Sequence, residues 1–553
     1  MASKLKIFSL GGLNEIGKNI TVFEYGNDLL IVDCGLGFPD DEMYGIDIVI
    51  PDFSFLEKNS DRIRGLVLTH GHEDHIGAVP YLLELIKDIP VYATKLTAAL
   101  LTLKLDEHKL TETTSLTVIE AGKRFRVGVF DIEPIHVNHS IADTVSLAIK
   151  TPIGMVIHTA DFKIDVTPIH GDMINLARFG QLGKDGVLCM LADSTNVEKP
   201  GHSVSESKVG ARFDQLFKDC DKRIIVTTFA SNIHRVQQII NSAAKYGRKV
   251  GITGRSLENV MRVSIELGYV TAPEGVIVDM NRIKGLPKKQ VVIITTGSQG
   301  EHMSALHRMA FSGHRQVEIN AGDRVIISAS AIPGNERTIS RVIDELFHKG
   351  AEVVYDRLSD LHVSGHACQE ELKMMLALIK PKFFMPVHGE HRHLRAHANL
   401  AQQVGVEPKN IIINETGRVL EITRKTAKLN GTVPSGRVLV DGSGVGDVGS
   451  VVMRDRRHLA EDGMVVVVMV LSSEDASLIS GPDIITRGFI FVKESEELMD
   501  ELKRVVNESL DCCSKGKIND WAAIKSKVRT NLSGFLYKTT KRSPMILPVI
   551  MEI

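Results

Sequence analysis

The sequence has few of the features that mark a secreted, disulfide-bonded or redox-active protein. Its 553 residues include six cysteines, which are far apart except for the adjacent pair Cys512 and Cys513, and no two form a C-x-x-C motif. A thiolate zinc finger or a thioredoxin-type site is therefore not expected. The low cysteine content is typical of proteins from a reducing cytosol.

Long hydrophobic runs are also missing. The longest strongly apolar stretch, Met464–Leu471, is much shorter than the roughly 18 residues that suggest a membrane span. The apolar run near the N-terminus is too short and too interrupted for a signal peptide. We therefore expect a soluble, cytoplasmic protein with no membrane partner.

The chain has no excess of charge of either sign. Its 66 lysines and arginines oppose 68 aspartates and glutamates, for a formal net charge of −2. This balance neither requires nor excludes a nucleic-acid partner, so any phosphate-binding surface must be local. The chain does have length: at about 150 residues per domain it predicts three or four domains.

The spacing of apolar residues differs between regions of the chain. The first 200 residues show short strands and turns before helices appear, whereas from about residue 204 helices and strands alternate regularly. That alternation predicts a mostly parallel sheet with helices on both faces. A polar, glycine-containing stretch after residue 425 is typical of a linker, and the tail from residue 451 has the pattern of a small α/β unit.

Some local predictions concern the later part of the chain. We expect paired strands at residues 411–414 and 418–422. In the tail, apolar runs predict strands at 465–471 and 489–492 and a helix at 495–510. The single tryptophan, Trp521, is expected in the core of this tail unit.

The strongest chemical signal is the segment Thr69-His70-Gly71-His72-Glu73-Asp74-His75, where a predicted buried strand ends and a helix begins. Imidazole and carboxylate groups are ligands that zinc and similar divalent ions accept. His70 and His72 can serve one ion while Asp74 and His75 serve a second. A solvated polar turn is the alternative, which the density of the cluster between buried segments disfavours.

These residues resemble the H-x-H-x-D-H motif of the metallo-β-lactamase superfamily. Further ligand-type residues follow later predicted strands in the order of that family: His139, Asp161 and His388. A single such histidine is more often a core residue, but its place after an apolar strand favours a ligand. The resemblance implies that one zinc is held by His70, His72 and His139, that a second is held by Asp74, His75 and His388, and that Asp161 bridges the two.

Two ions are suited to hydrolysis. Two cations about 3.5–4 Å apart can share a hydroxide, lower its pKa and stabilise charge on a phosphoryl or acyl oxygen. Each ion should keep a position open for solvent or substrate. Manganese or magnesium is an alternative to zinc.

The long β/α segment between Asp161 and His388 resembles the insertion of the β-CASP branch, which acts on nucleic acids. Two motifs of that branch have counterparts here: Asp193 lies in Leu191-Ala192-Asp193-Ser194-Thr195-Asn196, and His366 lies in His362-Val363-Ser364-Gly365-His366-Ala367. The match is closest to the ribonuclease J family and spans essentially the whole chain. Its other matching segments are 11–19, 229–232 with Arg235, 296–301 and 544–548.

The resemblance implies an α/β fold: a metallo-β-lactamase αββα sandwich, an inserted β-CASP α/β domain and a small C-terminal α/β domain. The implied limits are 1–205 and 370–430 for the metallo-β-lactamase domain, 206–369 for the β-CASP domain, 431–450 for a linker and 451–553 for a C-terminal oligomerisation domain.

Substrate-binding residues are expected in the inserted domain and its borders. His362, Ser364 and His366, with the amide of Gly365, can donate hydrogen bonds to a phosphate, and the family places a 5′-monophosphate or a backbone phosphate near them; a polar turn before a helix is the alternative. Asp193 belongs to the same group. Ser231 and Asn232 begin a predicted helix, where they can cap it or help to bind an anion, and the sequence does not separate the two roles.

The resemblance therefore implies a metal-dependent ribonuclease with endonuclease and 5′-to-3′ exonuclease action that favours 5′-monophosphate ends, in RNA maturation and decay. Asp74, Asp161 and His366 are the expected catalytic residues, with His366 as the proton donor to the leaving oxygen or, at the least, a group that stabilises the transition state. The expected partners are single-stranded RNA, further copies of the chain in a homodimer or homotetramer, and a paralogous subunit or RNA-degradation complex.

Three other functions remain open at this stage. A small-molecule metallohydrolase explains the ligands but not the inserted domain. A DNA nuclease of the same branch differs in whether it depends on the 2′-hydroxyl group. A non-catalytic RNA-binding subunit would show no metal-dependent cleavage.

Overall fold

The computed structural model describes residues 4–40, 42–301, 304–329, 335–355, 361, 363–473, 477–491, 495–515, 518 and 520–553. The chain separates into two compact units. The first unit comprises Met1–Phe38 and Ile48–Val438, and the second comprises Pro39–Asp47 and Leu439–Ile553. No helix among the described residues is long and apolar enough to cross a membrane.

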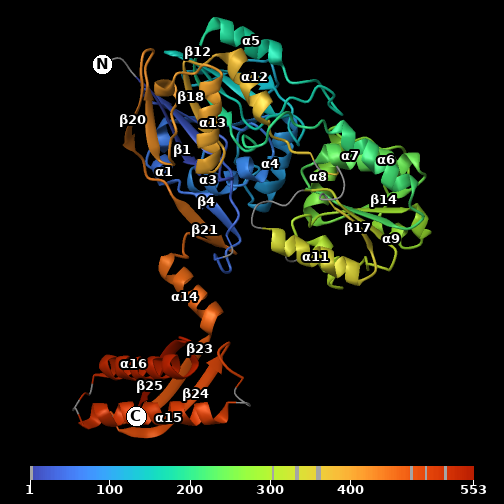
Figure 1. Ribbon diagram of the computed structural model, residues 1–553. Helices are drawn as coiled ribbons and strands as arrows, with labels where there is room; N and C mark the ends of the chain where they lie inside the picture. Colours follow the sequence, from blue (N-terminus) through green and yellow to red (C-terminus); the bar gives the residue numbers. More distant parts are fainter. Residues whose placement is uncertain are drawn as a thin grey trace. The chain divides into compact units, whose positions relative to one another are not determined.

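Two mixed sheets form the centre of the first unit (Figure 1). The eight-stranded sheet has the order β20-β19-β1-β2-β3-β5-β6-β7. Its strands are β1 Leu5–Gly11, β2 Ile20–Tyr25, β3 Asp28–Val32, β5 Ile63–Val67, β6 Val91–Ala93, β7 Leu116–Val118, β19 Arg418–Ile422 and β20 Ala427–Thr432. The six-stranded sheet has the order β18-β12-β11-β10-β9-β8. Its strands are β8 Phe125–Val127, β9 Phe130–His136, β10 Val145–Thr151, β11 Gly154–His158, β12 Val187–Asp193 and β18 Phe383–Val387.

The two sheets face one another across an apolar core, and helices cover their outer faces. Phe23 and Leu30 from the first sheet pack with Phe130, Leu147 and Phe383 from the second. The outer face of the second sheet is covered by α5 Leu176–Asp185, α12 Gln369–Ile379 and α13 His391–Gln403. On the first sheet, α4 Lys95–Glu107 packs against β6 and β7. This is the predicted αββα sandwich.

A separate five-stranded sheet, all parallel, lies between β12 and β18 in the sequence, with the order β14-β15-β13-β16-β17. Its strands are β13 Ile224–Thr227, β14 Lys249–Thr253, β15 Val291–Thr295, β16 Arg324–Ile327 and β17 Glu352–Val354. The helices between and before them are α6 Ser207–Lys218, α7 Ile233–Lys245, α8 Arg255–Glu266, α9 Met280–Ile283, α10 Ala305–Ala310 and α11 Glu336–His348. The regular alternation of the sequence predicted this inserted α/β domain.

The second unit contains a three-stranded sheet with two long helices on one face. The sheet has the order β24-β23-β25 and is built from β23 Met464–Leu471, β24 Leu478–Arg487 and β25 Met545–Glu552. The two long helices are α15 Glu496–Lys515 and α16 Trp521–Thr540, and the shorter α14 Ser450–Asp462 precedes β23. Alternate residues of β23, from Val465 to Leu471, are buried against α15 and α16, and Trp521 packs against this core as expected.

Two predicted strands are wrong. Residues 489–491 are not in a strand, because Phe489 inserts its side chain into the core of the second unit, and residue 492 lies outside the described residues. Residues 411–414 form only an isolated bridge from Ile411 to Phe384, and the strand partners of β19 are β1 and β20. In both places the apolar side chains pack into a core, and the backbone does not form the hydrogen bonds of a β-strand.

The buried carboxylate of Glu371 forms hydrogen bonds with the segments that enter and leave the inserted domain. Glu371, in the first turn of α12, is 0% exposed. Its Oε1 accepts hydrogen bonds from Ile164 N (2.8 Å) and Ser203 Oγ (2.7 Å), and its Oε2 accepts from Ser203 N (2.7 Å) and Cys368 N (2.8 Å). Four donors from three segments therefore depend on one side chain.

We expect Glu371→Ala to lower the free energy of unfolding by about 2–4 kcal/mol. The buried Cys368 N–H left without a partner costs about 1–3 kcal/mol, and the three partly buried donors cost less because water can reach them. Urea denaturation of the full chain measures the change. Glu370→Ala removes the neighbouring carboxylate, which pairs with Lys373 near the surface, and should change stability by less than about 0.5 kcal/mol. Equal effects of the two substitutions would contradict this assignment.

Candidate metal centre

Loops that follow strands of both sheets bring the predicted ligands together. His70, His72, Asp74 and His75 follow β5, His139 follows β9, Asp161 follows β11, and His388 follows β18. Asp193 is the last residue of β12, between β11 and β18 in the sheet. Because β11, β12 and β18 run parallel, their carboxyl ends meet at one edge, the usual place for a site in such sheets.

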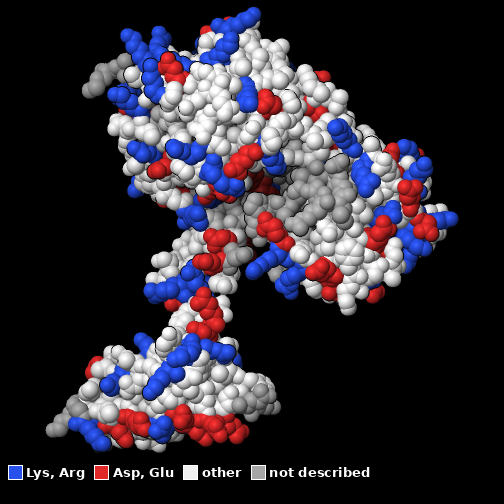
Figure 2. Space-filling view, viewed as in Figure 1, with Lys and Arg blue, Asp and Glu red and all other residues white. Residues whose placement is uncertain are grey.

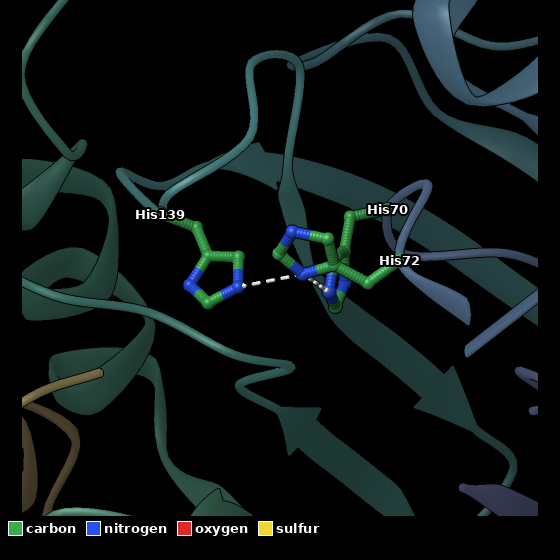
Figure 3. A group of neighbouring side chains, drawn as sticks. All are labelled: His70, His72 and His139. Atoms are coloured by element: carbon green, nitrogen blue, oxygen red, sulfur yellow. Dashed lines mark hydrogen bonds between the residues drawn. The ribbon is translucent and has the colours of Figure 1, made fainter. Parts of the chain in front are cut away.

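Three histidines form the first group of donors, as Figure 3 shows. His72 Nδ1 lies 3.0 Å from His70 Nε2 and 3.1 Å from His139 Nε2. Donors bound at 2.0–2.1 Å to one tetrahedral zinc would lie about 3.3 Å apart. The spacing of the three nitrogens therefore fits a single cation.

The hydrogen bonds on the far side of two of these rings decide which nitrogen carries the proton. His139 Nδ1 lies 2.8 Å from the carbonyl oxygen of Gly365, which can only accept, so this nitrogen is the donor. The Thr69 hydroxyl donates to Asp33 Oδ2 (2.9 Å) and so accepts from His70 Nδ1 (3.0 Å). The Nε2 atoms of His70 and His139 are therefore unprotonated, and their lone pairs face His72.

The protonation of these histidines suits a cation. Burial lowers the pKa of His70 and His139 well below the usual value, and burial lowers that of His72 to about 4. Neutral imidazole is the form that binds a metal. Three neutral rings converge here, and the Nε2 atoms of two of them point inward without a proton. This arrangement is suited to binding a cation.

The second group contains Asp74, His75, Asp161 and His388. Asp74 Oδ2 lies 3.2 Å from His388 Nε2 and 3.6 Å from His75 Nε2. Asn19 Nδ2 donates to Asp74 Oδ2 (3.3 Å) and to the Asp74 carbonyl oxygen (3.1 Å), which orients the carboxylate. Burial alone would raise the pKa of Asp74, but His75 and His388 hold it below its usual value, so it is a carboxylate.

One oxygen of Asp161 lies between the two groups. Asp161 Oδ2 is 3.2 Å from His75 Nε2 and 3.8 Å from His388 Nε2, and also 3.7 Å from His70 Nε2 and 3.8 Å from His139 Nε2. Asp161 is 2% exposed. Although burial would raise its pKa, the surrounding histidines hold it well below the usual value. This placement is the one that a bridging ligand needs.

Two buried carboxylates behind the ligands orient four histidines. Asp33 Oδ2 accepts from His75 Nδ1 (2.8 Å) and holds His70 through Thr69. In the same way Asp193 Oδ2 pairs with His366 Nδ1 (2.8 Å), and Asp193 Oδ1 accepts from the Thr195 hydroxyl (2.7 Å), which in turn accepts from His388 Nδ1 (2.5 Å). A carboxylate behind a ligating imidazole fixes its tautomer and ring orientation.

Sequence reasoning missed part of this supporting layer. Asp33, Thr69 and Thr195 were not predicted as site residues, although Asp33 directly follows β3, which pairs with β5, and Thr69 directly precedes His70. Asp33 and His388 have φ of +61° and +53°, a left-handed conformation that residues other than glycine rarely adopt. Such backbone strain is concentrated at functional sites.

The predicted substrate residues lie partly beside the ligands. The His366 ring is 5.0 Å from that of His139 and 5.5 Å from that of His388, centre to centre. Ser364 Oγ accepts from Asn196 Nδ2 (2.6 Å). A Cβ atom on Gly365 would lie 2.6 Å from His139 Cε1, so only glycine lets this backbone approach the ligand. His362 lies outside the described residues.

Ser231 and Asn232 are placed at the start of α7, in the inserted domain. Asn232 Oδ1 accepts from the backbone N–H of Arg235 (3.1 Å), so Asn232 caps the helix. Neither residue belongs to a donor group found among the described residues. Their role toward an anion stays a prediction.

Four family descriptions match successive parts of the chain. The matching descriptions are "Metallo-beta-lactamase superfamily" at residues 13–162, "Ribonuclease J, beta-CASP domain" at 221–346, "Zn-dependent metallo-hydrolase RNA specificity domain" at 351–413 and "Ribonuclease J C-terminal domain" at 451–553. Ribonuclease J2 of Bacillus subtilis is 41% identical over 549 residues, which cover 99% of each chain. The chain belongs to the ribonuclease J family. Ribonuclease J of Thermus thermophilus is 43% identical over 99% of this chain and 95% of its own.

Membership of the ribonuclease J family confirms the predicted family and fold, and makes the chain an enzyme of the metallo-hydrolase class. The superfamily implies divalent-metal binding, which the donor groups fit. A crystal structure of a protein of unknown function from Enterococcus faecalis V583 shares the fold, with a TM-score of 0.52 and 17% identity over 76% of this chain and 100% of that one.

We expect Asp33→Asn to weaken divalent-metal affinity by about 10–100-fold, since it removes the negative charge and replaces one of the two acceptor oxygens that orient His75 and, through Thr69, His70. Competition with a chromogenic chelator measures the affinity. Asp28→Asn changes the carboxylate at the other end of β3, which pairs with Arg64, and should leave metal affinity unchanged. Unaltered affinity in Asp33→Asn would refute the orienting role.

Proposed function

We propose that this protein is a metal-dependent ribonuclease that hydrolyses phosphodiesters of single-stranded RNA with two divalent ions, zinc in the first instance and manganese or magnesium as alternatives. The observation that carries the proposal is the position of Asp161 Oδ2 within 4 Å of ligand nitrogens from both donor groups. The names of the relatives and the match to an RNA specificity domain support RNA as the substrate.

Each predicted ligand has a role in this proposal. His70, His72 and His139 would hold one ion, Asp74, His75 and His388 the other, and Asp161 would contact both. Bound there, two divalent ions would activate water and stabilise negative charge on the phosphoryl oxygens. Asp74, whose side chain is 26% exposed, is open to solvent and would also orient the attacking water.

His366 is the proposed proton donor to the leaving 3′-oxygen. Its Nδ1 is held by Asp193 Oδ2 at 2.8 Å, which fixes the ring beside the ligands and leaves Nε2 for the substrate. Its side chain is 19% exposed, so the substrate can reach it. A positioned imidazole of this kind contributes general acid catalysis. Products would carry 5′-phosphate and 3′-hydroxyl ends.

The phosphate-binding group would contain Ser364, Gly365 and Asp193 together with His362, Ser231 and Asn232. We propose that it selects 5′-monophosphate ends, and that the enzyme acts both as an endonuclease and as a 5′-to-3′ exonuclease in cytoplasmic RNA maturation and decay. The proposed domains are 1–205 with 370–430, an inserted domain at 206–369, a linker at 431–450 and a C-terminal domain at 451–553.

Self-association as a dimer or tetramer is proposed to use the second unit. The face of its sheet away from α15 and α16 carries half-buried Val466 and Val468, flanked by exposed Ile485, Leu547 and Met551. Apolar patches of this kind mark association surfaces. Numbered names among the relatives, Ribonuclease J2 and Ribonuclease J 1, support a further proposal of a paralogous subunit in an RNA-degradation complex.

We expect His72→Ala to abolish turnover through loss of metal, whereas His366→Ala should lower kcat by about 10²–10⁴-fold with metal content retained. Metal analysis of each purified variant, combined with single-turnover cleavage, separates the two effects. His108→Ala, which removes a histidine paired with Glu84, is the control and should change neither quantity. Equal metal loss in His72→Ala and His366→Ala would contradict the assigned roles.

The proposed function is tested with one labelled RNA prepared with a 5′-monophosphate or a 5′-triphosphate, and with a DNA of the same sequence. We expect cleavage of the RNA that a chelator abolishes, with faster digestion from the monophosphate end. Cleavage of the DNA at the same rate would favour a DNA nuclease, and chelator-insensitive or absent cleavage would overturn the proposal.

A further inference from the structure

The end of the chain is strongly asymmetric in charge. From Trp521 to Met551 the sequence contains no acidic residue, but it contains six basic ones: Lys525, Lys527, Arg529, Lys538, Lys541 and Arg542. The preceding helix α15 is acidic, with six carboxylates opposed by Lys503, Arg504 and Lys515. Figure 2 shows the acidic side chains as a band along α15. Since the whole chain is nearly neutral, α16 is a local cationic surface of the kind that phosphates require.

The basic side chains of α16 are not neutralised by the fold. Among the residues that the structure describes, Lys525, Lys527, Arg529 and Lys538 form no ion pair. On α15, by contrast, Lys503 pairs with Asp500, and Arg504 with Glu501 and Glu508. Unpaired like charges repel one another, and this repulsion is relieved when a polyanion binds.

The outward face of α16 is shaped for a close approach. Ile524, Val528, Leu532 and Leu536 are buried in the core of the unit, which fixes the direction of the helix. At 100° per residue, the opposite line carries the small exposed residues Ser526, Thr530, Ser533 and Gly534. By the same rotation Lys527 and Lys538 flank this line on one side and Arg529 flanks it on the other, whereas half-buried Lys525 lies beside the buried face. The face is a low polar stripe with cations on both sides.

Two residues on this face have no evident use in the fold. A Cβ atom on Gly534 would meet no atom within 4 Å, so packing does not require glycine there, and glycine weakens a helix interior. Glycine does allow the backbone of a ligand to come close. Tyr537 is 56% exposed, with Lys541 Nζ 5.7 Å from its ring centre. An exposed aromatic ring beside cations is a stacking surface for a base.

We propose that the outward face of α16, formed by Lys527, Arg529, Gly534, Tyr537 and Lys538, binds the backbone of single-stranded RNA outside the metal centre. This inference rests on the proposed ribonuclease function, and it concerns the second unit alone. The other polyanion that the structure offers is α15 of a second copy. RNA is the better complement, because the carboxylates of α15 are partly paired with Lys503 and Arg504, whereas every RNA phosphate carries an unpaired charge.

The test uses the full chain, a chelator to prevent cleavage, and a fluorescent single-stranded RNA with a 5′-hydroxyl end. The variant combines Lys527→Gln, Arg529→Gln and Lys538→Gln. Loss of three phosphate contacts should weaken binding by about tenfold or more at low salt, and should reduce the slope of log K against log salt by about 2. Tyr537→Ala should weaken binding by about fivefold or more with the slope unchanged, since stacking releases no counterions.

The matched control combines Lys503→Gln, Arg504→Gln and Lys515→Gln on α15, which changes the net charge of the same unit equally. It should bind RNA like the wild type, and replacing Lys527 and Lys538 by arginine should preserve both affinity and slope. Thermal unfolding of each variant checks that the unit stays folded.

Equal weakening in the α15 control would overturn the proposal, since the effect would then be one of net charge alone. Unchanged RNA affinity with a lower oligomeric mass in the α16 variant would assign this face to a second copy instead. If the wild type cleaves RNA but the α16 variant binds it normally, only this inference fails. If the wild type neither binds nor cleaves RNA, the proposed function fails with it.

Discussion

The metal centre depends on two buried carboxylates that each hold two histidines from behind. Asp33 binds His75 directly and His70 through a threonine hydroxyl, and Asp193 binds His366 directly and His388 through another. Because the carboxylates and hydroxyls accept hydrogen bonds from the Nδ1 atoms, the Nε2 atoms of these rings point inward. Without that constraint, the rings could turn their Nδ1 atoms inward, and the pocket would have no fixed set of donor nitrogens for a cation.

The inserted domain is joined to the centre by polar contacts at both of its crossings. Where the chain enters the inserted domain, Glu371 accepts a hydrogen bond from Ser203 N. Arg235, which is 0% exposed, donates to Glu206 Oε1 (2.6 Å) near this entry and to the Leu361 carbonyl oxygen (2.8 Å) where the chain leaves the domain. Four residues beyond Leu361, the Gly365 carbonyl accepts from His139. The position of His366 is thus set by contacts among segments that lie far apart in the sequence.

Much of the centre could be predicted because its ligands are dense and follow apolar strands. His70 to His75 form an unmistakable cluster, and His139, Asp161 and His388 each follow a strand of the sandwich. The supporting residues could not be predicted this way, since an aspartate or threonine after a strand is an ordinary turn residue until the fold places it behind an imidazole. In the tail, α16 was not predicted because its exposed face carries serine, threonine and glycine, which are weak helix formers. The strand β24 was not predicted because Gly481-Pro482 lies within it, and glycine and proline are uncommon inside strands.

The most direct test of this account is the number and position of divalent ions bound by the protein. A crystal grown with zinc, with anomalous scattering measured at the zinc edge, should show two ions per chain about 3.5–4 Å apart. The account predicts that Asp161 Oδ2 contacts both, with His72 beside one ion and His388 beside the other. A single ion, or a pair of ions that Asp161 does not touch, would contradict it.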